Sequence, residues 1–446
     1  MTAIRGKALQ PGEIKKVKAR RVWDSRGNPT VEVEIHTDDG QFGRAIAPAG
    51  ASRGKREAID LRDGGDALAG MDVKQAVANV TDRIAPAICG MHVEDQSAID
   101  QAIIALDGSA LKNELGGNAT VATSLAVMHA AAASKRVPLW HHCADLAGAT
   151  PSLPLPEIQI FGGGVHAGNR VDIQDFMIMV PGASSFDEVM EVTSEVYRAA
   201  GSLMAKKGRL AGVADEGGWW PDFDHNEEAL EILVRAIEAT GEKPGERVVI
   251  SLDIAASEFG REGRYRLALD NRELGSDGMI QLLGRWIDDY PIASIEDPLG
   301  EDDRGGMREF TQEFGEKVQI IGDDYLVTNA TILEQAIGDG ACNGVLIKVN
   351  QIGTVTEALH CMQVAKSAGY SAIVSARSGE TEDVSISHMA VGFDAGQLKV
   401  GSFTRSERMM KWNECLRIGD EIGHGKFVRG LPLSATNWAK KLKRVA

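Results

Sequence analysis

The sequence predicts an α/β protein in which a small N-terminal α+β domain precedes an eight-stranded β/α barrel. Three observations support this prediction. The chain has 446 residues, which is more than one compact domain usually holds. A proline-rich segment at residues 148–157 divides it into two regions of different pattern. Beyond that segment, short apolar runs rich in β-branched residues alternate with helical patterns, as repeated βα units require.

The composition and charge argue against several kinds of partner. A net charge of −16 leaves no basic surplus to neutralise nucleic-acid or membrane phosphates, although a few local cations suffice for a small anionic substrate. Five scattered cysteines without a CxxC pair favour a reduced, cytoplasmic compartment. We expect no secretory signal, because no apolar stretch follows the basic N-terminal residues. The apolar runs are also too short for a membrane span.

The first region is predicted to contain three antiparallel strands followed by helices. Val31, Val33 and Ile35 alternate with polar residues, which is typical of a half-buried strand. An Asp-Gly pair at 39–40 supplies a hairpin turn to a second strand, and a further strand is expected near 17–22. The helical patterns that follow lie at residues 54–62, 71–88 and 118–135.

A change of pattern separates this region from the barrel. Pro151, Pro154 and Pro156 lie so close together that they exclude a helix and predict a linker. The apolar runs after it are predicted barrel strands, among them 247–252, 292–295, 318–322, 343–349 and 371–375. The expected boundaries are 1–14 for an N-terminal extension, 15–147 for the α+β domain and 148–446 for the barrel.

Polar residues close or follow the apolar runs at a regular spacing. They are Asp253, Glu296, Asp323, Lys348, Ser375 and Lys399. From Glu296 onward the steps are 27, 25, 27 and 24 residues, close to the roughly 30 residues per unit of an eight-fold β/α barrel. Functional groups of such barrels gather at the carboxyl ends of the strands, so these positions predict a site.

The chemistry of these residues points to a metal and a base. Asp253, Glu296 and Asp323 would repel one another unless a cation lay between them, and an oxygen-only ligand set favours Mg²⁺. The alternative is that each carboxylate caps a following helix. Lys348 and Lys399 would face the same mouth, where we expect one to act as a base and the other to anchor the substrate. Both could instead be anchoring cations.

Three glycine-rich loops add further candidates. GVADEGGWWPD carries Asp215 and Glu216, and GGGVHAGN carries His166, which could equally be a structural residue. The glycine run lacks the phosphate-loop pattern and is weak evidence alone. GASRG in the first domain is a flexible loop that could close over a site, with Ser52 as a hydroxyl ligand.

Ten motifs of the chain resemble those of the enolase family and occur in the family's order. They are WDSRGNPTVEVEI, GAS, HAGN, ADEGG, SLDIAASEF, SIEDP, GDD, KVNQIG, RSGETED and RSER. The resemblance runs from about residue 16 to about residue 425, and no predicted barrel strand carries the Lys-x-Lys motif of the racemase-like and lactonising relatives. It implies a modified (β/α)8, TIM-like barrel capped by the N-terminal α+β domain. It also implies a Mg²⁺-dependent glycolytic lyase that dehydrates 2-phosphoglycerate to phosphoenolpyruvate through an enediolate.

The resemblance also implies a role for each matching residue. The first Mg²⁺ would be held by Asp253, Glu296 and Asp323, and a second, arriving with substrate, by Ser52. The implied catalytic residues are Lys348 as the C2 base, Glu216 as the acid for the C3 hydroxide, and Asp175. The implied substrate contacts are Lys399 on the carboxylate, Arg377 and Ser378 on the phosphate, His166 on a closing loop, and Gln174. The resemblance further implies a small anionic phosphorylated substrate and a homodimer or octamer.

The chain departs from the family pattern on the acid side and in the lid. Ala376 stands where histidine is usual, Asp175 where glutamate is usual, and Arg53 where threonine is usual. Three hypotheses therefore stay open: a diverged enolase, a homologue acting on a related phosphorylated or phosphonylated acid as carboxyphosphonoenolpyruvate synthase does, and a non-catalytic relative. The intact metal ligands and lysines weigh against the third.

Overall fold

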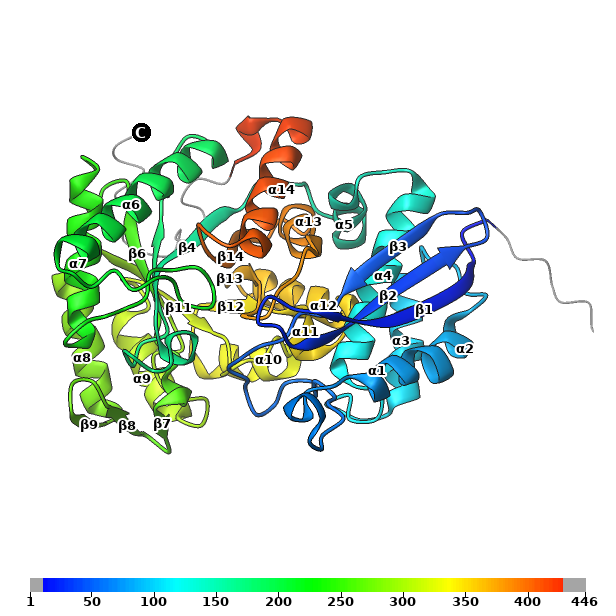
Figure 1. The fold of residues 1–446 in the computed structure, drawn as a ribbon, viewed down its shortest axis with the longest axis horizontal. Helices are drawn as coiled ribbons and strands as arrows, with labels where there is room; N and C mark the ends of the chain where they lie inside the picture. The colour runs from blue at the N-terminus through cyan, green and yellow to red at the C-terminus, as the bar shows by residue number, and fades with distance from the viewer. Residues whose placement is uncertain (1–10, 428–446) are drawn as a thin grey trace, which may run out of the picture.

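The computed structural model describes residues 11–427, which form two regions packed side by side (Figure 1). Residues 1–10 of the predicted N-terminal extension and residues 428–446 of the predicted barrel domain lie outside this range. The first region is an antiparallel sheet, ordered β1 (Ile14–Trp23), β2 (Pro29–Thr37) and β3 (Phe42–Ile46). Its helices are α1 (Lys74–Asn79), α2 (Ala85–Ile88), α3 (Gln96–Asp107), α4 (Gly117–Lys135) and α5 (Leu139–Ala147).

The alternating pattern of β2 explains how this sheet packs. Val31, Val33 and Ile35 are fully buried, and α4 packs against β2 and β3. The turn at residues 39–40 joins β2 to β3, as the sequence predicts. The helical pattern expected at 71–88 is present as α1, a π-helical turn and α2.

The helix expected at residues 54–62 is wrong, because this segment has no regular secondary structure. Apart from one turn, in which Glu57 N–H donates to the carbonyl oxygen of Gly54 at 3.2 Å, key backbone amides of the segment bond to distant parts of the chain. Ala58 N–H donates to the carbonyl oxygen of Gln351 at 2.7 Å, and Ile59 N–H to that of Leu111 at 2.7 Å. Tertiary contacts with the barrel therefore override the local helical pattern.

Eight strands close the barrel, in the order β10-β11-β12-β13-β14-β4-β5-β6. Their bounds are β4 (Leu155–Gly162), β5 (Asp175–Met179), β6 (Val249–Asp253), β10 (Ile292–Glu296), β11 (Gln319–Gly322), β12 (Gly344–Ile347), β13 (Ser371–Ser375) and β14 (Gly396–Ser402). β5 runs antiparallel to both β4 and β6, while the other pairs are parallel. This confirms a modified β/α barrel. The predicted linker is shorter than expected, since Pro156 already lies in β4.

Helices surround the barrel and follow its strands. They are α6 (Phe186–Lys206), α7 (Asn226–Ala239), α8 (Ser276–Asp289), α9 (Arg304–Phe314), α10 (Ala330–Asp339), α11 (Val349–Ile352), α12 (Val355–Ser367), α13 (Ser385–Gly392) and α14 (Ser406–Ile422). A small sheet of β7 (Gly260–Arg261), β8 (Arg264–Leu267) and β9 (Arg272–Gly275) lies between β6 and α8 in the sequence. No described helix combines the length and apolarity that crossing a bilayer requires.

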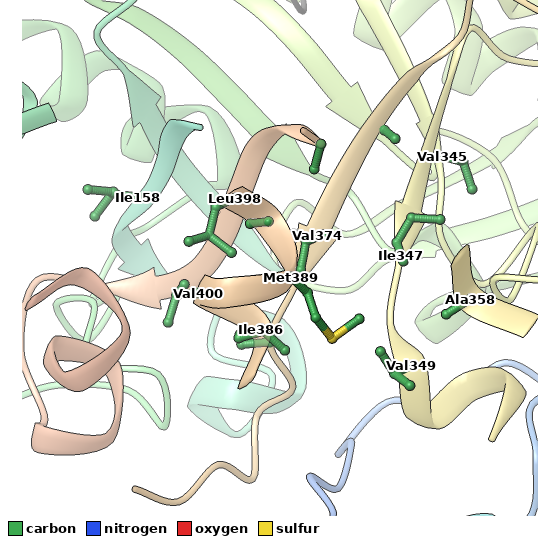
Figure 2. Close-up of a cluster of buried hydrophobic side chains, with 14 of the residues drawn as sticks. Ile158, Val345, Ile347, Val349, Ala358, Val374, Ile386, Met389, Leu398 and Val400 are labelled. Carbon is green, nitrogen blue, oxygen red and sulfur yellow. The ribbon is translucent and has the colours of Figure 1, made fainter. Parts of the chain in front are cut away.

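The hydrophobic core lies mainly between the barrel strands and the helices. Figure 2 shows Met389 of α13 among strand residues such as Val374 of β13 and Leu398 of β14. Alternate residues of the same strands point into the barrel, where Ile321, Leu346 and Ile373 form a separate small cluster. Because side chains alternate, a strand can bury an apolar face outside and still present polar groups at the barrel mouth.

Candidate active site

The carboxyl ends of the parallel strands bring the predicted polar residues together. Asp253 ends β6 and pairs in register with Glu296, which ends β10. Asp323 and Lys348 directly follow β11 and β12, and Lys399 lies in β14. All five side chains are at least nine-tenths buried. The predicted convergence at one end of the barrel is therefore present.

One pocket gathers ten of the twelve residues that the sequence singled out. They are Ser52, His166, Gln174, Asp175, Glu216, Asp253, Lys348, Arg377, Ser378 and Lys399. The other two, Glu296 and Asp323, contact the two lysines of the pocket. Ala376 also lines it, with its methyl where the resemblance expects an imidazole. The cavity measures about 20 Å³, which is room for about one water molecule.

Lys399 links the carboxylates of three strands. Its Nζ donates to Asp253 Oδ2 and to Glu296 Oε2, each at 2.8 Å, and lies 3.5 Å from Asp175 Oδ2. Burial alone would lower the pKa of this amine, but Asp253 and Glu296 outweigh burial and raise the pKa well above its ordinary value. Lys399 is therefore a fixed positive charge in this arrangement.

Lys348 forms a second buried pair, with Asp323. Its Nζ donates to Asp323 Oδ2, and the other carboxylate oxygen accepts from Gln351 Nε2 at 2.8 Å. Burial lowers the pKa of Lys348, but the charges of Asp323 and, to a lesser degree, Glu296 act against burial, and the pKa is raised on balance. In return, Lys348 offsets the effect of burial and lowers the pKa of Asp323. The pair is thus ionised in this arrangement.

The donor set fits a hard divalent cation. Asp253, Glu296 and Asp323 offer only carboxylate oxygens, the ligands that Mg²⁺ prefers. Glu296 Oε1 and Gln174 Oε1 are buried without a hydrogen-bond partner among the described residues. Burial and the neighbouring Asp253 raise the pKa of Glu296 well above its usual value, so this cluster is short of positive charge. A cation bound here would supply that charge.

A second acidic group beside this cluster is already satisfied. Asp297, Asp323 and Asp324 each bring a carboxylate oxygen within 4.8 Å of the others. Both oxygens of Asp297, however, accept backbone N–H groups, from Asp323 at 2.9 Å and from Asp324 at 2.7 Å. Asp297 therefore shapes the loop that presents Asp323.

Two further carboxylates, Asp175 and Glu216, lie close together beside Asp253, the register partner of Asp175. Asp175 begins β5, and Glu216 lies on the loop between α6 and α7. Burial raises the pKa of Asp175 to about 6, although Lys399 opposes this. Burial also acts on Glu216, but the charges of His166 and Arg408 lower its pKa on balance. In this arrangement Asp175 holds a proton more readily than Glu216.

His166 joins this acid side through a short 3-10 helix at Gly164–Ala167. Its Nε2 lies 3.8 Å from Glu216 Oε1, and its carbonyl oxygen accepts the N–H of Asp215 at 3.1 Å. The second contact ties the two glycine-rich loops together. His166 is thus a pocket residue that faces a carboxylate, as well as a structural link.

Arg377 and Ser378 meet the loop of the N-terminal domain. The Arg377 guanidinium donates to Glu57 at 3.0 and 3.2 Å and to the carbonyl oxygen of Ser52 at 3.0 Å. Ser378 Oγ accepts the N–H of Ala51 at 2.7 Å. The loop that carries Ser52 is therefore docked on the residues expected to bind phosphate.

Sequence reasoning missed several residues that hold this site. Arg408 of α14 donates to the carbonyl oxygens of Arg377 at 2.6 Å and Val400 at 2.8 Å. Glu57 was missed because it meets Arg377 across 320 residues of sequence, which local patterns do not reveal. Gln159 lies with Glu157 in a mostly apolar run, where polar residues at alternate positions were an available signal.

Two family models match the chain and together cover most of it. The model described as "Enolase, N-terminal domain" matches residues 14–143. The model described as "Enolase, C-terminal TIM barrel domain" matches residues 150–435, which is more than half of the chain. The two matches meet close to the junction between the small sheet domain and the barrel.

Proposed function

The chain belongs to the enolase family, and we propose that it is a Mg²⁺-dependent lyase that dehydrates 2-phosphoglycerate to phosphoenolpyruvate through an enediolate. One observation carries this proposal. A buried carboxylate cluster and two lysines share a pocket with an arginine, a serine and a further pair of carboxylates. This combination provides groups for abstracting a proton, expelling hydroxide and binding a phosphorylated acid.

The metal ligands would be the carboxylates of three neighbouring strands. Asp253, Glu296 and Asp323 would hold one Mg²⁺, and Ser52 would contribute to a second that binds with the substrate. The ions supply positive charge that stabilises the negative charge developing on the substrate carboxylate.

Lys348 is the proposed base that removes the C2 proton. A base must be neutral, and the contact with Asp323 now holds the Lys348 amine protonated. When Asp323 is engaged as a metal ligand, it provides less counter-charge to this amine, which favours the neutral form. Lys399 stays charged between Asp253 and Glu296 and is suited to hold the substrate carboxylate.

Glu216 and Asp175 are the proposed acid side, which assists the departure of the C3 hydroxide. With a pKa of about 6, Asp175 takes up a proton more readily than an ordinary aspartate, and that proton can be passed toward the leaving group directly or through Glu216. His166 and Gln174 line the same pocket and are proposed substrate contacts. Arg377 and Ser378 would bind the phosphate.

A second candidate function is supported by the altered pocket lining. Ala376 provides a methyl where an imidazole is expected, and Asp175 is one methylene shorter than the expected glutamate. A pocket with these changes suits a related phosphonylated or phosphorylated acid, which makes the chain similar to carboxyphosphonoenolpyruvate synthase.

A direct assay separates the two candidates. Purified protein is mixed with 2-phosphoglycerate and Mg²⁺, and the ultraviolet absorbance of phosphoenolpyruvate is followed. We expect turnover that disappears on chelation of Mg²⁺ and in a Lys348→Met variant. Absence of turnover, together with Mg²⁺-dependent binding of a phosphonate, would replace the first candidate with the second.

A further inference from the structure

We propose that Gln159 is a positioning residue that sets the geometry of the acid side and compensates for the short side chain of Asp175. This inference rests on the proposed function, because it concerns how the leaving-group side of that reaction is built. Gln159 lies in β4 and is fully buried. None of the resemblance motifs includes it.

The amide group of Gln159 contacts both acid-side carboxylates. Its Nε2 donates to Asp175 Oδ1 and lies 3.5 Å from Glu216 Oε2. Its Oε1 accepts the backbone N–H of Gly218 at 2.9 Å, which fixes the orientation of the amide. One neutral group therefore connects β5 to the loop that carries Glu216.

The surrounding backbone leaves room for this side chain. A Cβ on Gly218 would lie 2.4 Å from Gln159 Oε1, and a Cβ on Gly162 would lie 3.1 Å from the same atom. Two glycines on different segments thus allow the amide to fit against the backbone. The strand is anchored as well, because the Gln159 carbonyl oxygen accepts Ser402 Oγ at 2.6 Å.

The length of Gln159 matters because Asp175 is short. The two residues lie on antiparallel neighbours, β4 and β5, where Gly162 pairs with Asp175 and Gln159 pairs with Met177. The long side chain of Gln159 reaches along the strand to meet the aspartate. Replacing Gln159 with asparagine and Asp175 with glutamate would shorten one side chain and lengthen the other by one methylene, so their summed length would be unchanged. We therefore expect the two positions to depend on each other.

A neutral donor also suits the charges here. Two nearby carboxylates repel each other when both are ionised. Burial and the neighbouring Glu216 both raise the pKa of Asp175. Gln159 can donate to both carboxylates without becoming their counter-ion. A carboxylate at this position would add a third negative charge.

Kinetics of four variants test this dependence. They are Gln159→Leu, Gln159→Asn, Asp175→Glu and the double variant Gln159→Asn/Asp175→Glu. We expect Gln159→Leu to lower kcat for dehydration about 10- to 100-fold with KM changed less than about 3-fold, because a misplaced catalytic group costs rate rather than binding. The rate at which the C2 hydrogen exchanges with solvent should change less than about 3-fold, since the substitution does not touch the proposed base, Lys348.

The double variant is the decisive case. Each single change should lower kcat, whereas the double variant should return to within about 3-fold of the unmodified chain, an interaction that independent sites do not show. Gln397→Leu is the matched control: this buried barrel glutamine contacts Gln319 and not the acid side, so kcat should be unchanged. Purely additive losses, or full activity in Gln159→Leu, would overturn the inference.

Crystal structures of the same variants provide a readout that does not depend on the reaction. The separation of the Asp175 and Glu216 carboxylates should change in Gln159→Leu and be restored in the double variant. An unchanged separation in Gln159→Leu would refute the positioning role. If the unmodified chain does not turn over 2-phosphoglycerate, the proposed function fails, while this structural comparison still decides the role of Gln159.

Discussion

Single residues at the barrel mouth balance buried negative charge. Lys399 is the counter-ion that Asp253 and Glu296 share. Removing one partner of a buried ion pair typically costs about 3–5 kcal/mol, because the remaining charges stay unpaired. The stability of this cluster should therefore depend strongly on which cations it contains.

We predict that Lys399→Met lowers the midpoint of thermal unfolding in metal-free buffer. We also predict that Mg²⁺ raises this midpoint by more in the variant than in the unmodified chain. The cation would replace the missing positive charge, and preferential binding to the folded state stabilises it. Thermal unfolding with and without Mg²⁺ measures this effect. Lys411→Met is a control, since Lys411 is equally buried but bonds to Thr381 and Glu380. Equal Mg²⁺ gains in both variants would contradict the prediction.

His142 is predicted to make folding stability depend on pH. It is buried in α5, and neither ring nitrogen has a hydrogen-bond partner among the described residues. Burial, with a contribution from Lys135, lowers its pKa from 6.5 to about 4. The unfolded chain therefore binds a proton between these two values while the folded chain does not. Stability should fall as pH decreases from about 6.5 toward 4, at no more than about 1.4 kcal/mol per pH unit.

Urea unfolding at pH 7 and pH 5 checks this prediction. His142→Leu should lose less stability between the two pH values than the unmodified chain, by about 1–2 kcal/mol. His141→Leu is the matched control, because His141 neighbours it in α5 but is exposed. Identical pH dependence in the His142 variant and the unmodified chain would refute the assignment.

At the scale of elements, α14 supports the loop that carries Arg377 and Ser378. We predict that Arg408→Lys raises KM about 10-fold or more, because a lysine cannot donate to several carbonyl oxygens in the fixed geometry of a guanidinium. Steady-state kinetics measure the change. Arg417→Lys changes an exposed arginine of the same helix and should leave KM unaltered. An unaltered KM in Arg408→Lys would show that the loop holds its shape without α14.

The elements also show which features the sequence reveals. The alternation of Val31, Val33 and Ile35 and the regular spacing of the strand ends predict β2 and the barrel mouth correctly, because both follow from side-chain periodicity. The segment 54–62 was wrongly predicted, because its backbone bonds to Gln351 and Leu111, which are distant in the sequence. The roles of Arg408 and Glu57 depend on such contacts and carry no local signal.

For the whole molecule, the fold class and the family are confirmed, and the cap and the barrel share one site. The cap contributes Ser52 and Glu57, which contact Arg377 of the barrel. A cavity of about 20 Å³ is too small for the proposed phosphorylated three-carbon acid. Binding of that substrate would require the pocket to open, and we expect the loop that carries Ser52 to move.

Limited trypsin digestion tests this coupling. Arg53 is exposed on the loop, and we predict that Mg²⁺ with a phosphonate substrate analogue slows cleavage after Arg53 about 10-fold or more by holding the loop closed. Cleavage after Arg261, the exposed last residue of β7, is the internal control and should keep its rate. Equal effects at both bonds would indicate general stabilisation.

The reversed direction of β5 has a consequence for how such a site can diverge. β4 and β5 form a hairpin whose connection lines the pocket. As a result, Gln159, His166, Gln174 and Asp175 all fall within 17 consecutive residues. The proposed metal ligands come instead from the ends of three separate strands, β6, β10 and β11. One short segment therefore carries most of the proposed leaving-group side, with Glu216 as the exception. Exchange of this hairpin between relatives would change the surroundings of Glu216 and leave the proposed base Lys348 in place.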